Sequence, residues 1–138
     1  LQKSSDLTLS AIANKCIKEV SYHERFSSDW VKRLGDGTVE SKEKMQEAIN
    51  DLWTYTDELF HQTKADKAMV LESVGVDVTK LKGDYYKRVK DLLEEATLKI
   101  PESKWFQKGG KEGVHTEHLG YLLSDLQYMQ RTYPNMEW

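Results

Sequence analysis

The stretch SDLTLSAIANKCIKEVSYHERFSSDWVKRL, residues 5–34, decides the fold class of this chain. Its apolar side chains recur mostly at steps of three and four residues, the period of a helix with one buried face. They are Ile12, Cys16, Val20, then Trp30 or Val31, and Leu34. The following GDG at 35–37 ends the helix, because glycine accepts the left-handed cap conformation without strain. We therefore predict a first helix from about Ser5 to about Leu34.

This first helix is long for a small protein. At about 1.5 Å per residue it would extend roughly 45 Å, which is more than the width of a small domain. The other predicted helices are shorter. We therefore expect part of its apolar face to need a partner that the rest of the chain does not supply.

The same periodicity predicts further helices downstream. One begins at the N-cap Ser41 with an apolar seam that extends to Leu59. Shorter segments at 66–74, 77–98 and 114–133 follow, with a glycine- and lysine-rich loop at 101–113. Strand-like alternation is absent from the sequence. The prediction is an all-α protein in which residues 1–138 form a single helical domain.

The composition argues against nucleic-acid and membrane partners and indicates a reducing compartment. Charged residues make up 31% of the chain and the mean hydropathy is -0.70, as expected of helices that are each wet along one side. The net charge is -3 with both signs mixed, so the basic footprint of nucleic-acid binding is missing. No apolar run is long enough for a transmembrane helix. The single cysteine cannot form an internal disulfide, which favours a reducing, cytoplasmic location.

Several side chains are of types that can take part in chemistry, but their positions in the sequence favour a structural role. Cys16 lies on the predicted inward stripe, about two turns from His23, which is too far for that histidine to activate the thiol directly. We interpret Cys16 as a buried structural cysteine. Trp30, Trp53 and the pair at 85–86 are interpreted as core or interface aromatics, not as a platform for stacking bases.

Glu19 and His23 lie four residues apart on one face of the first helix, where they could ligate a metal or share a proton. Di-iron helical bundles instead use Glu-x-x-His, with ligands three residues apart. Val20 stands three residues before His23, and Tyr22 stands three after Glu19. We therefore predict a histidine that is hydrogen-bonded to its neighbouring carboxylate.

Glu112, His115 and His118 are the alternative metal candidates. They have the required three-residue steps, but Gly113 separates the glutamate from the predicted last helix. The remaining histidines are far away in sequence. The glycine-rich segment 109–113 lacks the Gly-Lys-Ser/Thr ending of a phosphate loop, so we favour a solvent loop. A small helical metalloprotein with this triad stays open as an alternative function.

Two stretches carry a family resemblance. The first is ANKCIKEVSYH at 13–23, which continues as RLGDGT at 33–38. The second is GGK at 109–111 followed by HTEHLG at 115–120, and KMQEAIN at 44–50 lies between them. In this order they resemble the phenylacetate-degradation protein family, in particular the C subunit of the bacterial phenylacetyl-CoA 1,2-epoxidase, a multicomponent monooxygenase.

This resemblance implies a ferritin-like helical bundle and a structural, non-catalytic role. The partner it implies is a homologous catalytic subunit that holds a di-iron centre and epoxidises the aromatic ring of a CoA thioester. The chain itself would then have no catalytic residue and no cofactor, and Glu19 and His23 would be a degenerate di-iron position. A homo- or hetero-oligomer without nucleic-acid or membrane partners is expected.

The size of the chain departs from the family. Members of the family are nearly twice as long, and the resemblance matches only their C-terminal part. We therefore expect residues 1–138 to be the C-terminal portion of a longer subunit. An unrelated homo-oligomeric helical scaffold is the remaining alternative.

Overall fold

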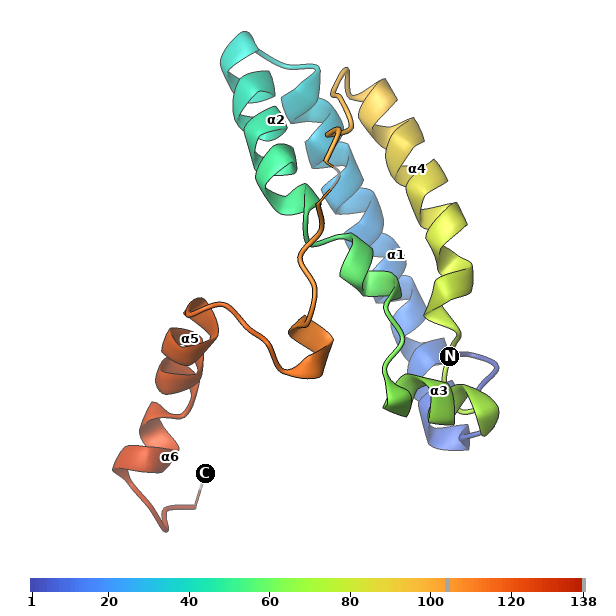
Figure 1. Cartoon of the computed structure of the whole chain (residues 1–138), viewed down its shortest axis with the longest axis vertical. Coiled ribbons are helices and arrows are strands. Elements are labelled where there is room, and N and C mark those ends of the chain that lie inside the picture. Colours follow the sequence, from blue (N-terminus) through green and yellow to red (C-terminus); the bar gives the residue numbers. More distant parts are fainter. Residues whose placement is uncertain (104, 138) are drawn as a thin grey trace. The chain divides into compact units, whose positions relative to one another are not determined.

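The computed structural model describes residues 1–103 and 105–137. The chain divides into two compact units, Leu1–Gln107 and Lys108–Trp138. Within the described residues there are helices and no strands, which confirms the all-α prediction (Figure 1). The single-domain expectation stays a prediction.

Helix α1 spans Leu7–Gly35, close to its predicted bounds. Asp6 is its N-cap, and the carboxylate accepts hydrogen bonds from the backbone N–H groups of Thr8 and Leu9 at 2.9 Å. The helix ends at Gly35, which lies against the chain that follows helix α4 (Lys82–Glu95). An added Cβ there would meet the carbonyl oxygen of Ala96 at 2.3 Å, so only glycine fits this close approach.

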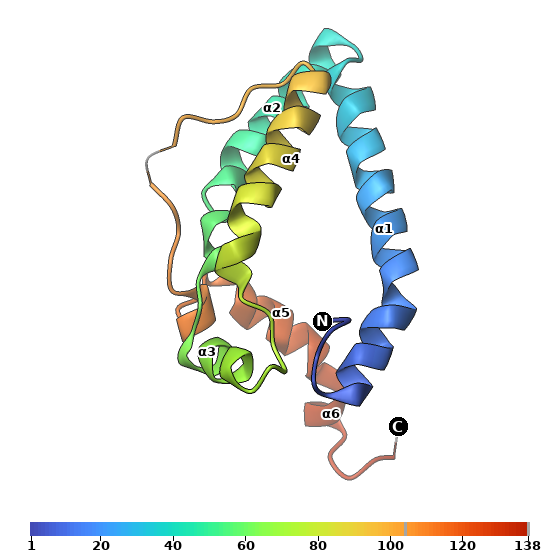
Figure 2. The same ribbon diagram turned by 90° about the vertical axis from the view of Figure 1, so that its right-hand side faces the viewer.

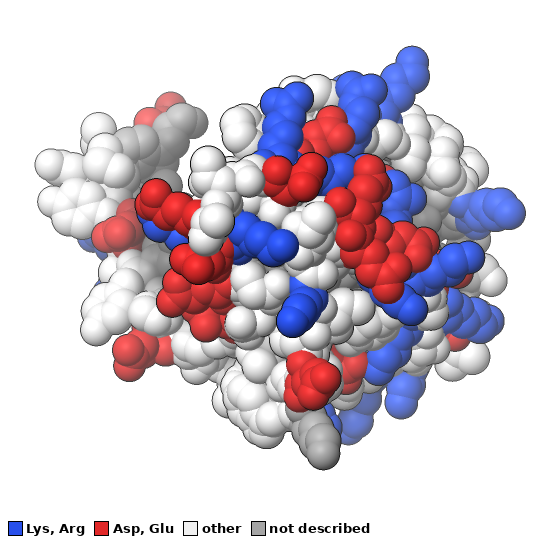
Figure 3. Space-filling view, turned by 90° about the horizontal axis from the view of Figure 1, so that it is seen from above, with Lys and Arg blue, Asp and Glu red and all other residues white. Residues whose placement is uncertain are grey.

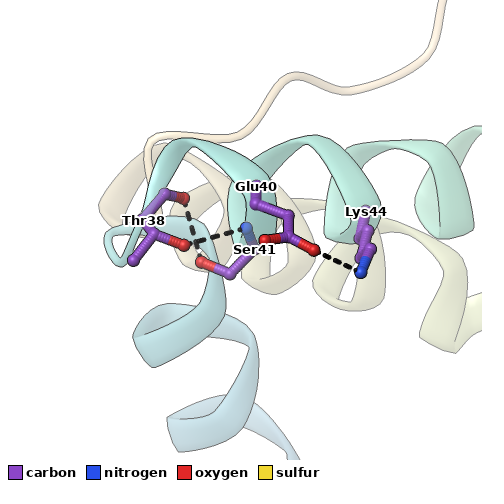
Figure 4. Close-up of polar contacts among 4 residues, drawn as sticks. All are labelled: Thr38, Glu40, Ser41 and Lys44. Carbon is purple, nitrogen blue, oxygen red and sulfur yellow. Dashed lines mark hydrogen bonds and ion pairs between the residues drawn. The ribbon is translucent and has the colours of Figure 1, made fainter.

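Helix α2 spans Val39–Trp53, and its start differs from the prediction. Thr38, not Ser41, is the N-cap, because its side-chain oxygen accepts from the backbone N–H of Ser41 at 3.2 Å. The Ser41 hydroxyl donates instead to the carbonyl oxygens of Leu34 (2.8 Å) and Thr38 (3.0 Å). Figure 4 shows this first turn together with the ion pair of Glu40 and Lys44. The turn thereby fastens α2 to the end of α1.

The remaining elements of the first unit are shorter. They are η1 (Asp57–Phe60), α3 (Lys64–Leu71), η2 (Val78–Leu81) and α4 (Lys82–Glu95). The predicted helix at 77–98 is therefore wrong at both ends. Its beginning is the 3-10 turn η2, and it stops at Glu95 because Thr97 adopts a positive φ of 59°.

The core of this unit is small and lies where α1, α2 and α4 meet, an arrangement visible in Figures 1 and 2. Its buried members are Leu93, Ala96 and Leu98. Val31, Met45, Ile49 and Val89 pack against them and are partly buried. The hydroxyl of Thr97 donates to the carbonyl oxygen of Gly35 at 3.0 Å and so ties α1 to the end of α4.

The N-terminal two thirds of α1 lie outside this core. Ile12, Val20 and Phe26 each expose about half of their surface, as does Trp30 one turn further on. Cys16 is exposed as well, so its interpretation as a buried cysteine is wrong. The periodicity placed Cys16 correctly on the apolar stripe, but in the described structure no element packs on that part of the stripe.

The second unit contains η3 (Gly110–Glu112), α5 (His118–Leu126) and α6 (Tyr128–Thr132). The predicted helix at 114–133 is thus shorter and divided. Gly113 has a left-handed φ of 88°, and the backbone N–H of Val114 bonds to the carbonyl oxygen of Gly109 at 2.8 Å. This left-handed turn closes η3 and interrupts the helical backbone, and the regular helix starts only at His118.

Candidate functional site

The capped, uninterrupted helix α1 brings Glu19 and His23 together on one side. The Glu19 Oε1 and His23 Nε2 atoms lie 3.0 Å apart, and the two side chains are 71% and 67% exposed. Val20 lies beside them and is also exposed. The predicted contact between the histidine and its neighbouring carboxylate is present, but both side chains are exposed and do not lie inside a bundle. The pair can hold or exchange a proton, but it offers a metal only two ligands.

The second candidate set is not assembled in the structure. Glu112 ends η3, His115 lies in the non-helical segment before α5, and His118 is the first residue of α5. Only His118 therefore lies on a helix, so the three-residue step does not place the two histidines on one helical face. Among the described residues, no three His, Cys, Asp or Glu side chains are placed to hold a metal ion.

An apolar groove lies on the first unit, between α1, α2 and α4. Its volume is about 310 Å³, and its walls are almost entirely apolar. Leu52 in its wall has 65% of its surface accessible, while Trp53 and Leu93 are buried. Such a groove can accept apolar side chains of a partner. Periodicity had found most of these residues, but not that their groove stays open.

An aromatic cluster adjoins one end of this groove. Trp53 meets Tyr86 edge-on at 5.8 Å between ring centroids, and Phe60 packs against both Tyr85 (5.1 Å) and Tyr86 (6.0 Å). Burial raises the pKa of the Tyr85 phenol above its usual value of 10.0, and Tyr86 adds to this effect. The interpretation of Trp53, Tyr85 and Tyr86 as packed aromatics is confirmed, whereas Trp30 is 45% exposed and its role as an interface residue stays a prediction.

A polar pair that sequence reasoning missed borders the cluster. The Lys82 ammonium hydrogen-bonds the Asp57 carboxylate, which raises the pKa of Lys82, and the Tyr86 hydroxyl lies 3.5 Å from the same carboxylate. Asp57 and Lys82 are 25 residues apart in the sequence, so no local sequence pattern predicts this contact. The pair fastens η1 to the start of α4 and has no evident catalytic use.

Charges of both signs are interspersed over the described surface, as Figure 3 shows for one face. This agrees with the net charge of -3. No helix in the described ranges combines the length and the apolar character needed to cross a membrane.

Comparison with known proteins gives two matches. The family model described as phenylacetic acid catabolic protein matches residues 1–138. The C subunit of the 1,2-phenylacetyl-CoA epoxidase of Escherichia coli (strain K12) is 46% identical over 138 residues, which is all of this chain and 56% of that protein. The chain thus spans little more than half the length of this curated relative. The predicted ferritin-like helical fold is confirmed by this family match, and the chain belongs to the phenylacetic acid catabolic protein family.

Proposed function

We propose that this chain acts as a non-catalytic, structural subunit of a phenylacetyl-CoA ring-1,2-epoxidase complex in aerobic phenylacetate catabolism. The observation that carries the proposal is the 46% identity, along the entire chain, to the C subunit of such an epoxidase. The role of the chain is to bind and support a homologous catalytic subunit. The complex would operate in the cytoplasm, where a single unpaired cysteine stays reduced.

The non-catalytic role is supported by the spacing on α1. A di-iron bundle needs Glu-x-x-His on this kind of helix, and Val20 stands where the glutamate belongs. Glu19, one position earlier, reaches His23 by an ordinary i,i+4 contact. In this proposal the iron belongs to the catalytic partner, which uses oxygen and reducing equivalents to epoxidise the ring. The present chain contributes binding surface only.

The apolar groove between α1, α2 and α4 is our candidate for part of that surface. Partner side chains that enter it would be removed from water, a gain of about 25 cal/mol for each Å² of apolar area buried. Leu52 lies at the groove and is largely exposed, so it can contact a partner without supporting the fold.

The test is co-expression of this chain with the catalytic subunit from the same organism, followed by pull-down and gel filtration. One co-eluting complex is expected, with iron content that follows the catalytic subunit. Two separate peaks would contradict the proposal, as would iron retained by this chain when it is purified alone.

A pair of matched variants locates the contact. Leu52→Glu places a charge in the groove and should weaken co-elution, because a charge is costly to bury without a partner. Leu71→Glu makes the same change at an 84% exposed position of α3, away from the groove, and should leave the complex intact. Equal behaviour of the two variants would argue against the groove while leaving the proposed role untouched.

A further inference from the structure

Helix α4 ends in a left-handed turn whose left-handed residue is not glycine. Thr97 has a φ of 59°. Its backbone N–H bonds to the carbonyl oxygen of Glu94 at 3.1 Å, and the N–H of Leu98 bonds to that of Leu93 at 2.8 Å. These two bonds are those of a Schellman motif, in which glycine is the common residue. A β-branched residue in this conformation is strained and persists only where its surroundings hold it.

Two contacts with the rest of the first unit begin to explain why a threonine stands at this position. Its hydroxyl donates to the carbonyl oxygen of Gly35, the last residue of α1, at 3.0 Å. The last carbonyl groups of a helix have no partner within that helix, so this bond satisfies one of them. A glycine at position 97 would relieve the strain but could not make the bond. Leu98, the next residue, is buried in the core with 5% of its surface exposed.

A third contact holds the following residue by its backbone. The Gln46 Oε1 atom on α2 accepts from the backbone N–H of Lys99 at 2.8 Å, and the Gln46 Nε2 atom donates to the carbonyl oxygen of Lys99 at 2.9 Å. The side-chain amide thus pairs with both backbone groups of one residue, as a partner residue does in an antiparallel sheet. Gln46 and Lys99 are 53 residues apart in the sequence.

Asn50 determines how the Gln46 amide is oriented. Its Oδ1 atom, one turn further along α2, accepts a hydrogen bond from Gln46 Nε2 at 3.0 Å. An amide nitrogen has two hydrogens to donate, and Gln46 uses one for Asn50 and one for Lys99. The nitrogen is therefore directed to the carbonyl oxygen of Lys99, which leaves Oε1 to accept from its N–H group.

We propose that Thr97 and Gln46 form a latch that locks the chain leaving α4 onto α1 and α2, with Asn50 as the residue that orients Gln46. The strain at Thr97 favours opening, and the contacts at residues 97–99 keep the latch closed. Opening releases this turn as one local unit while α1, α2 and α4 stay folded. The closed latch fixes the direction in which the chain leaves the core of the first unit. This inference does not depend on the proposed function, because it concerns only contacts within that unit.

Amide hydrogen exchange of the full chain, followed by NMR, measures the latch residue by residue. The Lys99 amide should be protected in the wild-type chain, because Gln46 accepts its hydrogen. Gln46→Leu should raise the exchange rate of this amide by more than about tenfold, since two hydrogen bonds are lost. Thr97→Val keeps the β-branch but loses the hydroxyl. It should raise the exchange rate of the same amide by about fivefold, although the lost bond is to Gly35.

Conservative variants separate hydrogen bonding from simple filling of space. Thr97→Ser retains the hydroxyl and Asn50→Asp retains the acceptor for Gln46, so both should keep the Lys99 amide protected. Asn50→Leu removes that acceptor and should speed exchange at Lys99. Glu47→Leu is the control for Gln46→Leu, because it places the same side chain at the next, exposed position of α2. It should leave the Lys99 amide protected.

Limited digestion with trypsin gives a second readout. Cleavage after Lys99 requires the latch to be open, so its rate follows the open population. Gln46→Leu and Thr97→Val should both be cut there faster than the wild-type chain, with the site identified by mass spectrometry. Amides in the middle of α2 and α4 should exchange at wild-type rates in every variant, which distinguishes opening of the latch from a general loss of stability.

Four results would overturn the proposal. One is a Lys99 amide that is unprotected in the wild-type chain, and another is a Gln46→Leu variant that exchanges as the wild type does. A third is a Thr97→Val variant with unchanged exchange at Lys99, because the two contacts would then act separately. The fourth is faster exchange throughout α2 and α4 in these variants, which would show that the turn does not open on its own.

Discussion

At the scale of single residues, glycines and N-cap side chains determine where helices begin and end. Gly35 ends α1 where the chain after α4 passes close to it, with Leu98 only 2.9 Å from the position of an added Cβ. The GDG motif correctly indicated a helix end, but neither of its glycines adopts the predicted left-handed conformation, and the close approach of Ala96 to Gly35 is a tertiary fact. Asp77 is the N-cap of η2, and its carboxylate also accepts a hydrogen bond from the Gln62 side-chain amide at 2.9 Å.

Gly35→Ala should destabilise the protein by about 1–3 kcal/mol, because the new Cβ overlaps the backbone and cannot be relieved by a side-chain rotation. Gly83→Ala is the matched control, since nothing lies within 4 Å of its added Cβ. It should stabilise the protein by about 0.4–1 kcal/mol by restricting the unfolded chain. Urea denaturation of both variants measures the difference. Equal effects would show that the contact between Gly35 and Ala96 does not exist in solution.

The pKa of Asp77 should be below its usual value of 3.8, chiefly because the Thr79 hydroxyl donates to the carboxylate, at 2.6 Å. A depressed folded-state pKa means that the ionised group stabilises the fold above its unfolded-state pKa. That contribution is lost as the pH falls through the folded-state value. NMR titration of the carboxyl group measures the pKa. Thr79→Val should return it toward 3.8, and an unchanged pKa in this variant would refute the assigned cause.

At the scale of elements, sequence periodicity located the helices but misjudged several boundaries. The second helix starts at Val39 and not after Ser41, and the last predicted helix loses its first turn and divides at Gln127. The first error arises because a serine or threonine hydroxyl near a helix end can bond to several neighbours, and the three-dimensional environment selects which bond forms. The late start of the last helix follows from the left-handed turn at Gly113. The short helix α3, by contrast, is stabilised by a capping box formed between residues close in the sequence.

Thr63→Ala should destabilise the protein by about 0.5–2 kcal/mol, because it removes the N-cap of α3. The Thr63 hydroxyl oxygen accepts from the backbone N–H of Asp66 at 3.1 Å, and the Asp66 carboxylate accepts from the Thr63 backbone N–H at 2.9 Å. Lys64→Ala alters the first turn of the same helix without touching this capping box and serves as the control. Thermal unfolding followed by circular dichroism compares the two variants. Equal unfolding temperatures would show that the cap does not stabilise the protein.

At the scale of the whole molecule, the two units differ in how they are stabilised. The first unit contains the cluster around Leu93 and Ala96. In the second unit, from Lys108 onward, none of the described side chains is buried. Its helices α5 and α6 are nine and five residues long, which is short for helices without packing.

A chain shortened to residues 1–107 should therefore unfold at nearly the same temperature as the full chain. The buried cluster lies wholly within this range, so its removal from water is unchanged by the truncation. Differential scanning calorimetry of both chains makes the comparison. A large drop in the unfolding temperature would show that residues 108–138 contribute to the stability of the first unit.

The sequence alone determined the all-helical class, the family and the exclusion of a Glu-x-x-His motif on α1. These follow from local periodicity, from motif order and from the place of Val20, none of which requires a neighbour in space. Only the tertiary structure decided that Cys16 is exposed, that Glu112, His115 and His118 are not assembled, and that Asp57 meets Lys82. The physical reason is that periodicity marks a face as apolar without saying whether another element covers it. On α1 the apolar face extends well beyond the described elements that pack on it.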